Sequence, residues 1–324
     1  MQLKAGVIGV GSLGRHHARV LAGLEGVDLV GVADLKEDRA KEVAHDLGCE
    51  AFVDCRQLLA KVEAVTLAVP TEDHVALGLE ALERDIHLLV EKPIATSLEG
   101  ADRLIEAAER GSRVLHVGHI ERFNPVLQAV LPHVKQPQFF EAHRLGVFVP
   151  RSLDVDVVLD LMIHDLDLVL WLTGRKVRDV RAVGIPVLTP RVDIANARIE
   201  FSDGCVANLT ASRVSRDRVR KLRFFQAHDY VSLDLHSRTL EMYSLEEREG
   251  HRTIRERAPE VASTDPLEAE LSAFVAAARG GEAVHSCTGL QARGALALAL
   301  EVVEQSKRAI AATQAADPTG QMEA

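Results

Sequence analysis

The first 120 residues alternate short runs of consecutive apolar residues with segments whose apolar positions recur at helical spacing. Consecutive apolar runs are typical of strands covered on both faces, as in a parallel sheet. The expected strands are 5–8, 27–33, 64–69, 86–90 and 113–117, and the clearest helices are 13–24 and 97–110. This order predicts an α/β domain built on a doubly wound parallel sheet.

The second half of the chain has a different pattern. Between about residues 138 and 257, apolar and polar residues alternate in short segments, and Asp203-Gly204 and His228-Asp229 supply turn residues. The clearest elements here are strands 195–201 and 206–212 and helices 157–172, 267–278 and 289–307. We therefore expect an α+β domain with a large, mostly antiparallel open sheet.

Length and charge narrow the class of protein. The chain has 324 residues, more than the ~250–300 that one hydrophobic core usually serves, so we expect two domains. We divide it into 1–120 and 121–324, with the C-terminal helices able to pack back on the first domain. The formal net charge of −10 argues against a nucleic-acid partner, because such proteins normally carry a basic excess.

We expect a cytoplasmic protein without a membrane partner. Residues 1–8 lead directly into a strand without the basic and apolar segments of a signal peptide, and no apolar stretch approaches the ~20 residues of a membrane span. The 4 cysteines are scattered and form no CxxC pair. The sequence therefore predicts neither a metal centre nor a disulfide framework.

A glycine-rich motif follows the first expected strand. In Gly9-x-Gly11-x-x-Gly14, the first glycine permits a tight turn, the second lets a pyrophosphate approach the backbone, and the third permits close helix packing. The helix that begins there offers unpaired N–H groups to phosphates. The motif, with its strand before and helix after, predicts a dinucleotide-binding Rossmann domain whose loop residues are Gly9, Gly11, Ser12, Leu13 and Gly14.

An acidic residue lies where such a domain binds the adenosine ribose. Asp34 ends the second expected strand, 20 residues beyond Gly14. A carboxylate there accepts hydrogen bonds from the ribose hydroxyls and repels a 2′-phosphate. We therefore expect NAD rather than NADP as the cofactor. His17 lies on the apolar stripe of the following helix, and we interpret it as a packed histidine.

The apolar helix 157–172 carries an acidic and imidazole stripe. Asp160, His164 and Asp167 lie at i, i+4 and i+7, on one helix face among apolar neighbours. Buried polar groups without partners cost ~1–3 kcal/mol each, so the stripe requires either a structural network or a functional cavity. The pattern alone favours neither.

Two motifs extend the argument beyond cofactor binding. Glu91-Lys92-Pro93 ends the fifth strand, and Asp160-x-x-x-His164 lies on the apolar helix. With the glycine loop and two-domain pattern, they make the whole chain resemble the Gfo/Idh/MocA oxidoreductase family. One departure is Asp154-Val155-Asp156-Val157, which replaces the glycine-rich segment that many members carry before this helix.

The resemblance implies an NAD-dependent dehydrogenase that oxidises a secondary hydroxyl of a sugar. His164 would be the general base, Lys92 would bind the reacting oxygen and position the nicotinamide, and Asp160 would orient the substrate and His164. The remaining implied cofactor contacts are Glu91 at a ribose, and Pro70, Thr71 and His74 beside the nicotinamide. For His74, packing at a helix start is the alternative.

Segments 117–125 and 151–156 resemble one branch of the family, which oxidises C3 of UDP-N-acetylglucosamine on the pathway to the 2,3-diamino-sugar of lipid A. A nucleotide sugar needs cations for its pyrophosphate. The candidate substrate-binding residues are Arg122, Asn124, Arg144 and Arg151, with Arg213 as a further cation. For any single arginine, solvation at the surface is the alternative.

Two other functions remain open. A different polyol or free-sugar dehydrogenase, such as an inositol dehydrogenase, would keep every motif except the arginines. A regulatory protein that senses NAD without turnover is the second, and the intact Lys92, Asp160 and His164 count against it. A broad sheet with helices on one face also predicts a homodimer or homotetramer, because a large uncovered apolar face is rare in monomers.

Overall fold

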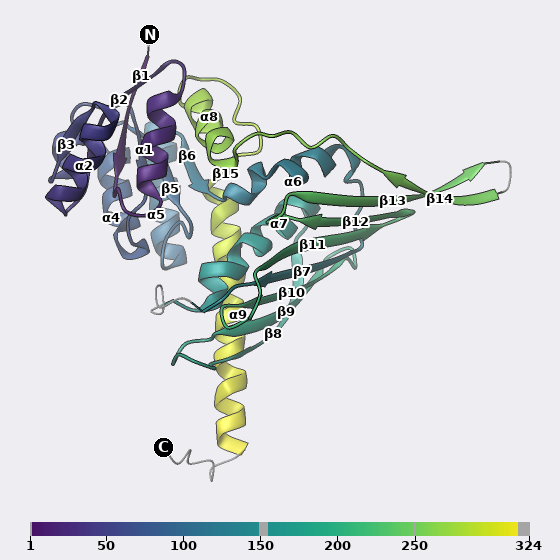
Figure 1. Ribbon diagram of the computed structural model, residues 1–324. Coiled ribbons are helices and arrows are strands. Elements are labelled where there is room, and N and C mark those ends of the chain that lie inside the picture. The colour runs from purple at the N-terminus through teal and green to yellow at the C-terminus, as the bar shows by residue number, and fades with distance from the viewer. Residues whose placement is uncertain (1, 149–154, 249–250, 317–324) are drawn as a thin grey trace. The chain divides into compact units, whose positions relative to one another are not determined.

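The computed structural model describes residues 2–148, 155–248 and 251–316 (Figure 1). Its contacts divide the chain into two compact units. The first takes in residues up to Phe123 together with Thr264–Leu296, and the second takes in Asn124–Ser263 and the chain from Ala297 on. A segment that follows the second sheet in sequence therefore belongs to the first unit.

The first unit is built on a seven-stranded sheet in the order β15-β6-β5-β4-β1-β2-β3. All neighbours are parallel except β15 and β6. The strands are β1 (Leu3–Ile8), β2 (Val27–Ala33), β3 (Glu50–Phe52), β4 (Ala64–Leu67), β5 (His87–Glu91), β6 (Leu115–Gly118) and β15 (Cys287–Thr288). The predicted doubly wound parallel sheet is confirmed, and the strand order reverses between β1 and β4.

Helices cover both faces of this sheet (Figure 1). They are α1 (Gly14–Gly23), α2 (Glu37–Leu47), α3 (Cys55–Leu59), α4 (Thr71–Leu82), α5 (Leu98–Gly111), the 3₁₀ turn η1 (Ile120–Phe123) and α8 (Pro266–Ala278). Local sequence fixes several ends: Ser97 caps α5 by accepting from the Gly100 N–H, and Asp265 caps α8 through Leu267 and Glu268. These caps satisfy backbone donors that a helix start leaves unpaired.

Helix α8 completes the core of the first unit. Leu271, Phe274 and Val275 of α8 share a buried cluster with Leu21 of α1 and Val7 of β1. Burying such side chains contributes about 1.5–3 kcal/mol each. The packing of α8 on the first sheet therefore explains why residues 264–296 return to this unit.

The second unit contains an eight-stranded sheet in the order β14-β13-β12-β11-β7-β10-β9-β8. Only the central pair β7 and β10 is parallel, and the other pairs are antiparallel. The strands are β7 (Phe139–Leu145), β8 (Val177–Ile185), β9 (Ile194–Phe201), β10 (Val206–Ser212), β11 (Val219–Gln226), β12 (Asp229–Asp234), β13 (Thr239–Arg248) and β14 (His251–Arg257). The prediction of a large, mostly antiparallel sheet is confirmed.

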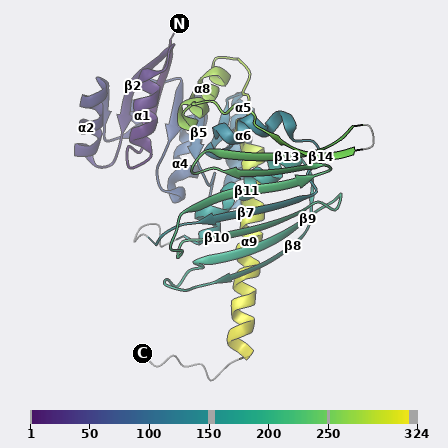
Figure 2. The same ribbon diagram turned by 45° about the vertical axis from the view of Figure 1, so that its right-hand side comes forward.

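The helices of the second unit lie against one face of this sheet (Figure 2). They are α6 (Pro125–Val130), the 3₁₀ turn η2 (Leu131–His133), the π-helical turn η3 (Val158–Met162), α7 (Ile163–Thr173) and the portion of α9 (Gly289–Ala316) from Ala297 on. Gln305 of α9 binds edge strand β8, donating to the Val180 carbonyl and accepting from the Ala182 N–H, both at 2.9 Å. No described helix of the second unit lies on the opposite face.

Aromatic side chains cross the uncovered face in a row over β7, β11, β12 and β13. Ring centroids are 5.8 Å apart for Phe139 and Phe225, 5.3 Å for Phe225 and Tyr230, and 6.0 Å for Tyr230 and Tyr243. The row contains both tyrosines of a chain with only 4% aromatic residues. We call Phe139, Phe225, Tyr230 and Tyr243 the aromatic row.

Within the described part of the chain, no helix is both long and apolar enough to span a membrane.

Candidate functional site

The glycine loop lies at the carboxyl ends of β1 and β4, where the strand order reverses. Such a switch point is where doubly wound sheets bind their ligands. Gly9 has φ +84°, and a Cβ there would lie 2.6 Å from the Ala68 carbonyl oxygen. A Cβ on Gly14, the first residue of α1, would lie only 1.8 Å from the Gly9 carbonyl oxygen. The turn and the close approach therefore both require glycine.

A cavity of about 750 Å³ opens beside this loop. Its volume lies within the range of small-molecule and cofactor sites, ~300–1,000 Å³. Four predicted cofactor residues line it: Gly9, Gly11, Asp34 and Pro70. Apart from its chain neighbours, a Cβ on Gly11 would meet just one atom of the described residues within 4 Å, Arg39 Nη1 at 3.7 Å, so a phosphate has room at this backbone. The other loop residues, Ser12 and Leu13, are exposed.

The Asp34 carboxylate connects the ends of β1 and β2. Its Oδ2 accepts from the Val10 N–H at 3.0 Å and lies 3.2 Å from Arg39 Nη1, while its Oδ1 accepts from the Lys36 N–H at 2.9 Å. A carboxylate offers about four acceptor positions, and these contacts use three. Asp34 is therefore oriented rigidly and keeps capacity for a ribose hydroxyl.

Sequence reasoning missed Arg39. It lies five residues beyond Asp34, on α2, and its guanidinium also lines the cavity. The sequence prediction included no cation near Asp34, whereas the first turn of α2 returns Arg39 to the same edge of the sheet. A wider search of that first turn for cations would have found it.

Pro70, Thr71 and His74 lie at the junction of β4 and α4. Pro70 precedes α4, Thr71 is its first residue, and His74 follows within the first turn. The His74 ring is buried, with Nδ1 2.9 Å from the Pro93 carbonyl oxygen and Nε2 3.0 Å from the Val69 carbonyl oxygen. Burial lowers the pKa of His74, although both carbonyl contacts act in the opposite sense. The imidazole thus connects this junction to the segment after β5.

Glu91 is the last residue of β5 and Lys92 directly follows it, at the strand end where the sequence predicted them. Sequence reasoning assigns Glu91 to a cofactor ribose; in the structure its Oε1 lies 3.0 Å from Nε2 of His17, which is 1% exposed. Its Oε2 accepts from the Lys92 backbone N–H at 3.3 Å. Burial raises the pKa of the Glu91 carboxyl, but the hydrogen bond and charge of His17 and the charge of Lys92 outweigh it and hold the pKa below its ordinary value.

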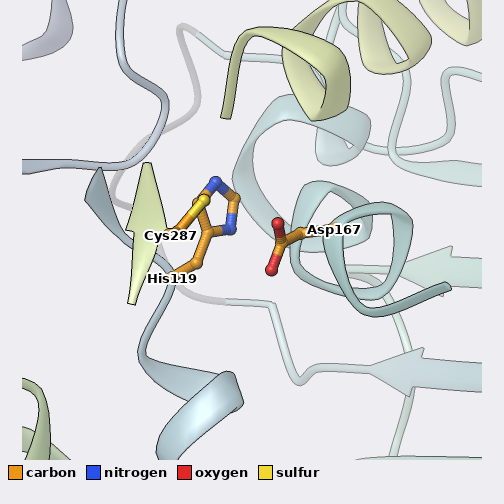
Figure 3. A group of neighbouring side chains, drawn as sticks. All are labelled: His119, Asp167 and Cys287. Carbon is orange, nitrogen blue, oxygen red and sulfur yellow. The ribbon is translucent and has the colours of Figure 1, made fainter. Parts of the chain in front are cut away.

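A histidine and a cysteine lie close together at the edge of the first sheet, where β15 pairs with β6. Because β15 pairs with β6, Cys287 lies opposite Val117, and the His119 ring and the Cys287 sulfur are close together (Figure 3). Both residues are 1% exposed. Neither was predicted as a site residue, and the sequence separation of the two strands explains why.

In the second unit, Asp160 lies in the π-helical turn η3 and His164 in the first turn of α7. Both are partly exposed, whereas Asp165 and Asp167 (the latter labelled in Figure 3) are buried. The sequence predicted a regular α-helix here. The π turn spaces the residues around Asp160 differently from an α-helix, and such turns are frequent at functional sites.

The start of η3 is anchored by Asp156. Its Oδ1 accepts from the Val192 N–H at 3.1 Å, and its carbonyl accepts from the Leu159 and Asp160 N–H groups, each at 3.1 Å. Arg213 reinforces this region, with Nε 3.6 Å from an Asp193 oxygen and Nη2 donating to the Val155 carbonyl. The predicted further cation Arg213 is therefore buried in contacts that support the helix start.

The described candidate substrate residues Arg122, Asn124 and Arg144 have protein partners. Arg122, 1% exposed, donates from Nη1 to Gln291 Oε1 at 2.8 Å and to the Ser286 carbonyl at 3.3 Å. Asn124 caps α6 and donates to the Leu235 carbonyl at 3.0 Å.

Arg144 forms a two-bond ion pair with Asp165. Its Nε and Nη2 donate to the Asp165 oxygens at 2.9 and 2.8 Å. Both side chains are buried, so this pair holds β7 against α7. Arg151, the remaining candidate, lies outside the described residues, as does Asp154 of the segment before η3. Of the predicted cofactor residues, Gly9, Gly11, Asp34 and Pro70 thus line one cavity, whereas the described candidates Arg122, Asn124 and Arg144 each contact protein groups of their own unit.

The fold and these motifs define a class. The chain belongs to the Gfo/Idh/MocA family of oxidoreductases: residues 3–119 match the family's NAD-binding Rossmann-fold model, and residues 133–227 match its C-terminal domain model. The chain is therefore an oxidoreductase with an NAD-binding Rossmann domain, as its motifs predicted.

Individual relatives extend this result. The chain is 42% identical over 309 residues to a UDP-N-acetylglucosamine 3-dehydrogenase of Acidithiobacillus ferrooxidans, covering 93% of this chain and 96% of that protein. A solved structure of that enzyme superposes with a TM-score of 0.89, covering 95% of this chain and 99% of the other. An inositol 2-dehydrogenase of Rubrobacter xylanophilus is 34% identical over 194 residues, 57% of this chain and 56% of that protein.

Proposed function

We propose that this protein is an NAD-dependent dehydrogenase that oxidises the C3 hydroxyl of UDP-N-acetylglucosamine. The observation that carries the proposal is the 42% identity to a UDP-N-acetylglucosamine 3-dehydrogenase over 93% of the chain. The inositol 2-dehydrogenase is less similar and matches a smaller part. A polyol dehydrogenase is thus the second candidate, and the presence of Lys92, Asp160 and His164 argues against a regulatory protein without turnover.

The residues fit this chemistry. Bound NAD would supply the hydride acceptor, with the glycine loop and the α1 N-terminus receiving its pyrophosphate and Asp34 its adenosine ribose. Lys92 donates to the substrate oxygen, and its positive charge stabilises the alkoxide that develops there. His164 accepts the hydroxyl proton, and Asp160 orients the substrate and the imidazole. The partial exposure of Asp160 and His164 on a mostly buried helix supports these roles.

The substrate assignment is tested by following NAD reduction with a panel of alcohols. We expect kcat/KM for UDP-N-acetylglucosamine to exceed that for UDP-glucose, myo-inositol and glucose by at least about tenfold, because an enzyme site that hydrogen-bonds a substrate group discriminates strongly against analogues that lack it. The Lys92→Ala protein provides the baseline. Preferential oxidation of myo-inositol would select the polyol dehydrogenase instead.

The cofactor is NAD rather than NADP in this proposal, and Arg39 sharpens the test. We expect Asp34→Ala to weaken NAD binding and to strengthen NADP binding, together changing the ratio of the two dissociation constants by at least about tenfold. The physical reason is that the variant removes the ribose acceptor and releases the Arg39 guanidinium, which is 3.2 Å from Asp34, to bind a 2′-phosphate. Fluorescence titration with NADH and NADPH measures both constants.

A double variant is the control for this effect. Asp34→Ala with Arg39→Ala should lose the gain in NADP binding while keeping the loss in NAD binding. Tighter binding of NADPH than NADH by the unmodified protein would refute the cofactor assignment.

We further propose that two copies of the chain associate through the uncovered sheet face. The aromatic row lies on this face, and Phe225 and Tyr243 are each 37% exposed. Aromatic side chains dominate interface energetics, so this row would form the centre of the contact. Light scattering at micromolar concentration should give at least twice the mass of one chain.

A charge placed in the aromatic row should weaken this association. Phe225→Asp is expected to raise the dimer dissociation constant by at least about tenfold. The new carboxylate would be buried without a partner in the interface between the two copies, which is costly. The control is Leu290→Asp, at a 70% exposed position of the first unit. A single-chain mass for the unmodified protein would exclude the association.

A further inference from the structure

Two buried histidines contact the chain on either side of Lys92. His17 comes from α1 and His74 from α4, and each is 1% exposed. The two residues they contact, Glu91 and Pro93, directly precede and follow Lys92 in sequence. We call His17 and His74 the histidine pair.

The His17 contact fixes the Glu91 carboxylate. Besides the 3.0 Å contact to His17 and the hydrogen bond from the Lys92 N–H, this carboxylate packs directly on Gly118 of β6. A Cβ on Gly118 would lie 2.9 and 3.0 Å from the two Glu91 oxygens. The carboxylate is thus held by an imidazole, a backbone amide and a neighbouring strand, which leaves little freedom for the start of the Lys92 peptide.

The His74 contact fixes the other side. Its Nδ1 lies 2.9 Å from the Pro93 carbonyl oxygen, and its Nε2 lies 3.0 Å from the Val69 carbonyl oxygen. One ring therefore spans the end of β4 and the segment after β5. Because both contacts are to backbone carbonyls, the ring fixes main-chain positions rather than mobile side chains.

We infer that His17 and His74 are positioning residues for Lys92, acting through Glu91 and the Pro93 carbonyl respectively. This inference rests on the proposed role of Lys92. His17 lies on the helix that begins at Gly14, so the same contact connects Lys92 to the helix start where the cofactor pyrophosphate would bind. The long, flexible Lys92 side chain reaches one substrate oxygen reproducibly only if the Lys92 backbone is held in place. Displacements of ~1 Å can cost ~10²-fold in rate.

Each imidazole has two ring nitrogens that can be replaced separately. Variants that keep only one of them can therefore distinguish a positioning role from a purely structural role. A glutamine amide nitrogen substitutes for Nε2, and an asparagine amide nitrogen substitutes for Nδ1. His17→Gln keeps a donor towards Glu91, and His17→Asn does not reach it. For the second residue the order reverses: His74→Asn keeps the contact to Pro93, and His74→Gln keeps only the contact to Val69.

We expect His17→Gln and His74→Asn to retain at least about a third of kcat, and His17→Asn and His74→Gln to lose at least about tenfold. The NADH dissociation constant should change less than threefold in all four variants, because the proposed dinucleotide contacts at the glycine loop and Asp34 are left intact and Lys92 placement affects mainly the chemical step. The controls are His16→Gln and His16→Asn, at the exposed neighbour of His17 on the same helix. Both should behave like the unmodified protein.

A second readout does not depend on turnover. Acetylation of Lys92 by acetic anhydride, followed by mass spectrometry, should be at least about threefold faster in His17→Asn and His74→Gln than in their partner variants. The inference is overturned if kcat and Lys92 labelling follow the melting temperature alone, or if the asparagine and glutamine variants do not differ. If the unmodified protein fails to oxidise any UDP-sugar, the proposed function fails, while the labelling rates still decide the role of the histidine pair.

Discussion

Replacing His164 by alanine is expected to lower kcat by about 10²–10⁴-fold and to leave the NADH dissociation constant within twofold of the unmodified value. Proton transfer is needed only at the chemical step, so removal of the base does not change cofactor binding. His164 is partly exposed, and its truncation should therefore cost little stability. Steady-state kinetics and thermal unfolding on the same preparation measure both effects.

The pH profile distinguishes a base from a structural histidine. In the unmodified protein, kcat/KM should rise through an apparent pKa that belongs to the base, and this rise should be lost in His164→Ala. His236→Ala, at an exposed position of the second unit, is the control and should keep both the rate and the profile. A His164→Ala protein that unfolds at lower temperature but turns over normally would assign His164 to a structural network.

The fold was predictable because its signals are local. Continuous apolar runs identified β1, β2, β4, β5 and β6, since a strand covered on both faces has no polar position to interrupt it. The glycine spacing located the dinucleotide loop because that signal is local as well. The positive φ at Gly9 and the close approach at Gly14 leave no alternative residue type. These constraints act within a few residues of the chain.

The side-chain partners were less predictable because they depend on distant segments. His17 and Glu91 are separated by 74 positions and meet only in the folded chain, where an α1 side chain contacts the last residue of β5. Sequence reasoning identified His17 as packed, which is correct, but could not name its partner. The same limit applies to Arg144 and Asp165, whose charges are buried together on β7 and α7. A pattern of charges along the chain does not reveal which of them neutralise one another.

The π-helical turn at Asp160 was missed for a different reason. Apolar periodicity distinguishes helices from strands but does not separate an α-helix from a short segment with one extra residue per turn. The Asp160 and His164 positions were identified from residue type and resemblance, and their placement at the junction of η3 and α7 came from the structure.

Replacing Gly14 by alanine should raise the NADH dissociation constant by at least about 100-fold. The added Cβ would lie 1.8 Å from the Gly9 carbonyl oxygen, far below any tolerated contact. Gly9 cannot yield, because its N–H donates to the Ala33 carbonyl at 2.7 Å and Ala68 lies directly beside it. The start of α1 must therefore move away, and it takes with it the N–H groups that would bind the pyrophosphate.

The control for this variant lies on the same helix. Apart from its own helix backbone and chain neighbours, a Cβ on Gly23, the last residue of α1, would meet no atom of the described residues within 4 Å, so Gly23→Ala adds the same methyl group without a clash. It should leave NADH binding unchanged and stabilise the protein by up to about 1 kcal/mol, the usual gain from removing a helical glycine. Gly14→Ala should instead lose about 1–3 kcal/mol, as overpacked sites do. Titration with NADH and urea unfolding of both variants measure these effects, and equal NADH affinities for the two alanine variants would show that the loop does not bind the dinucleotide.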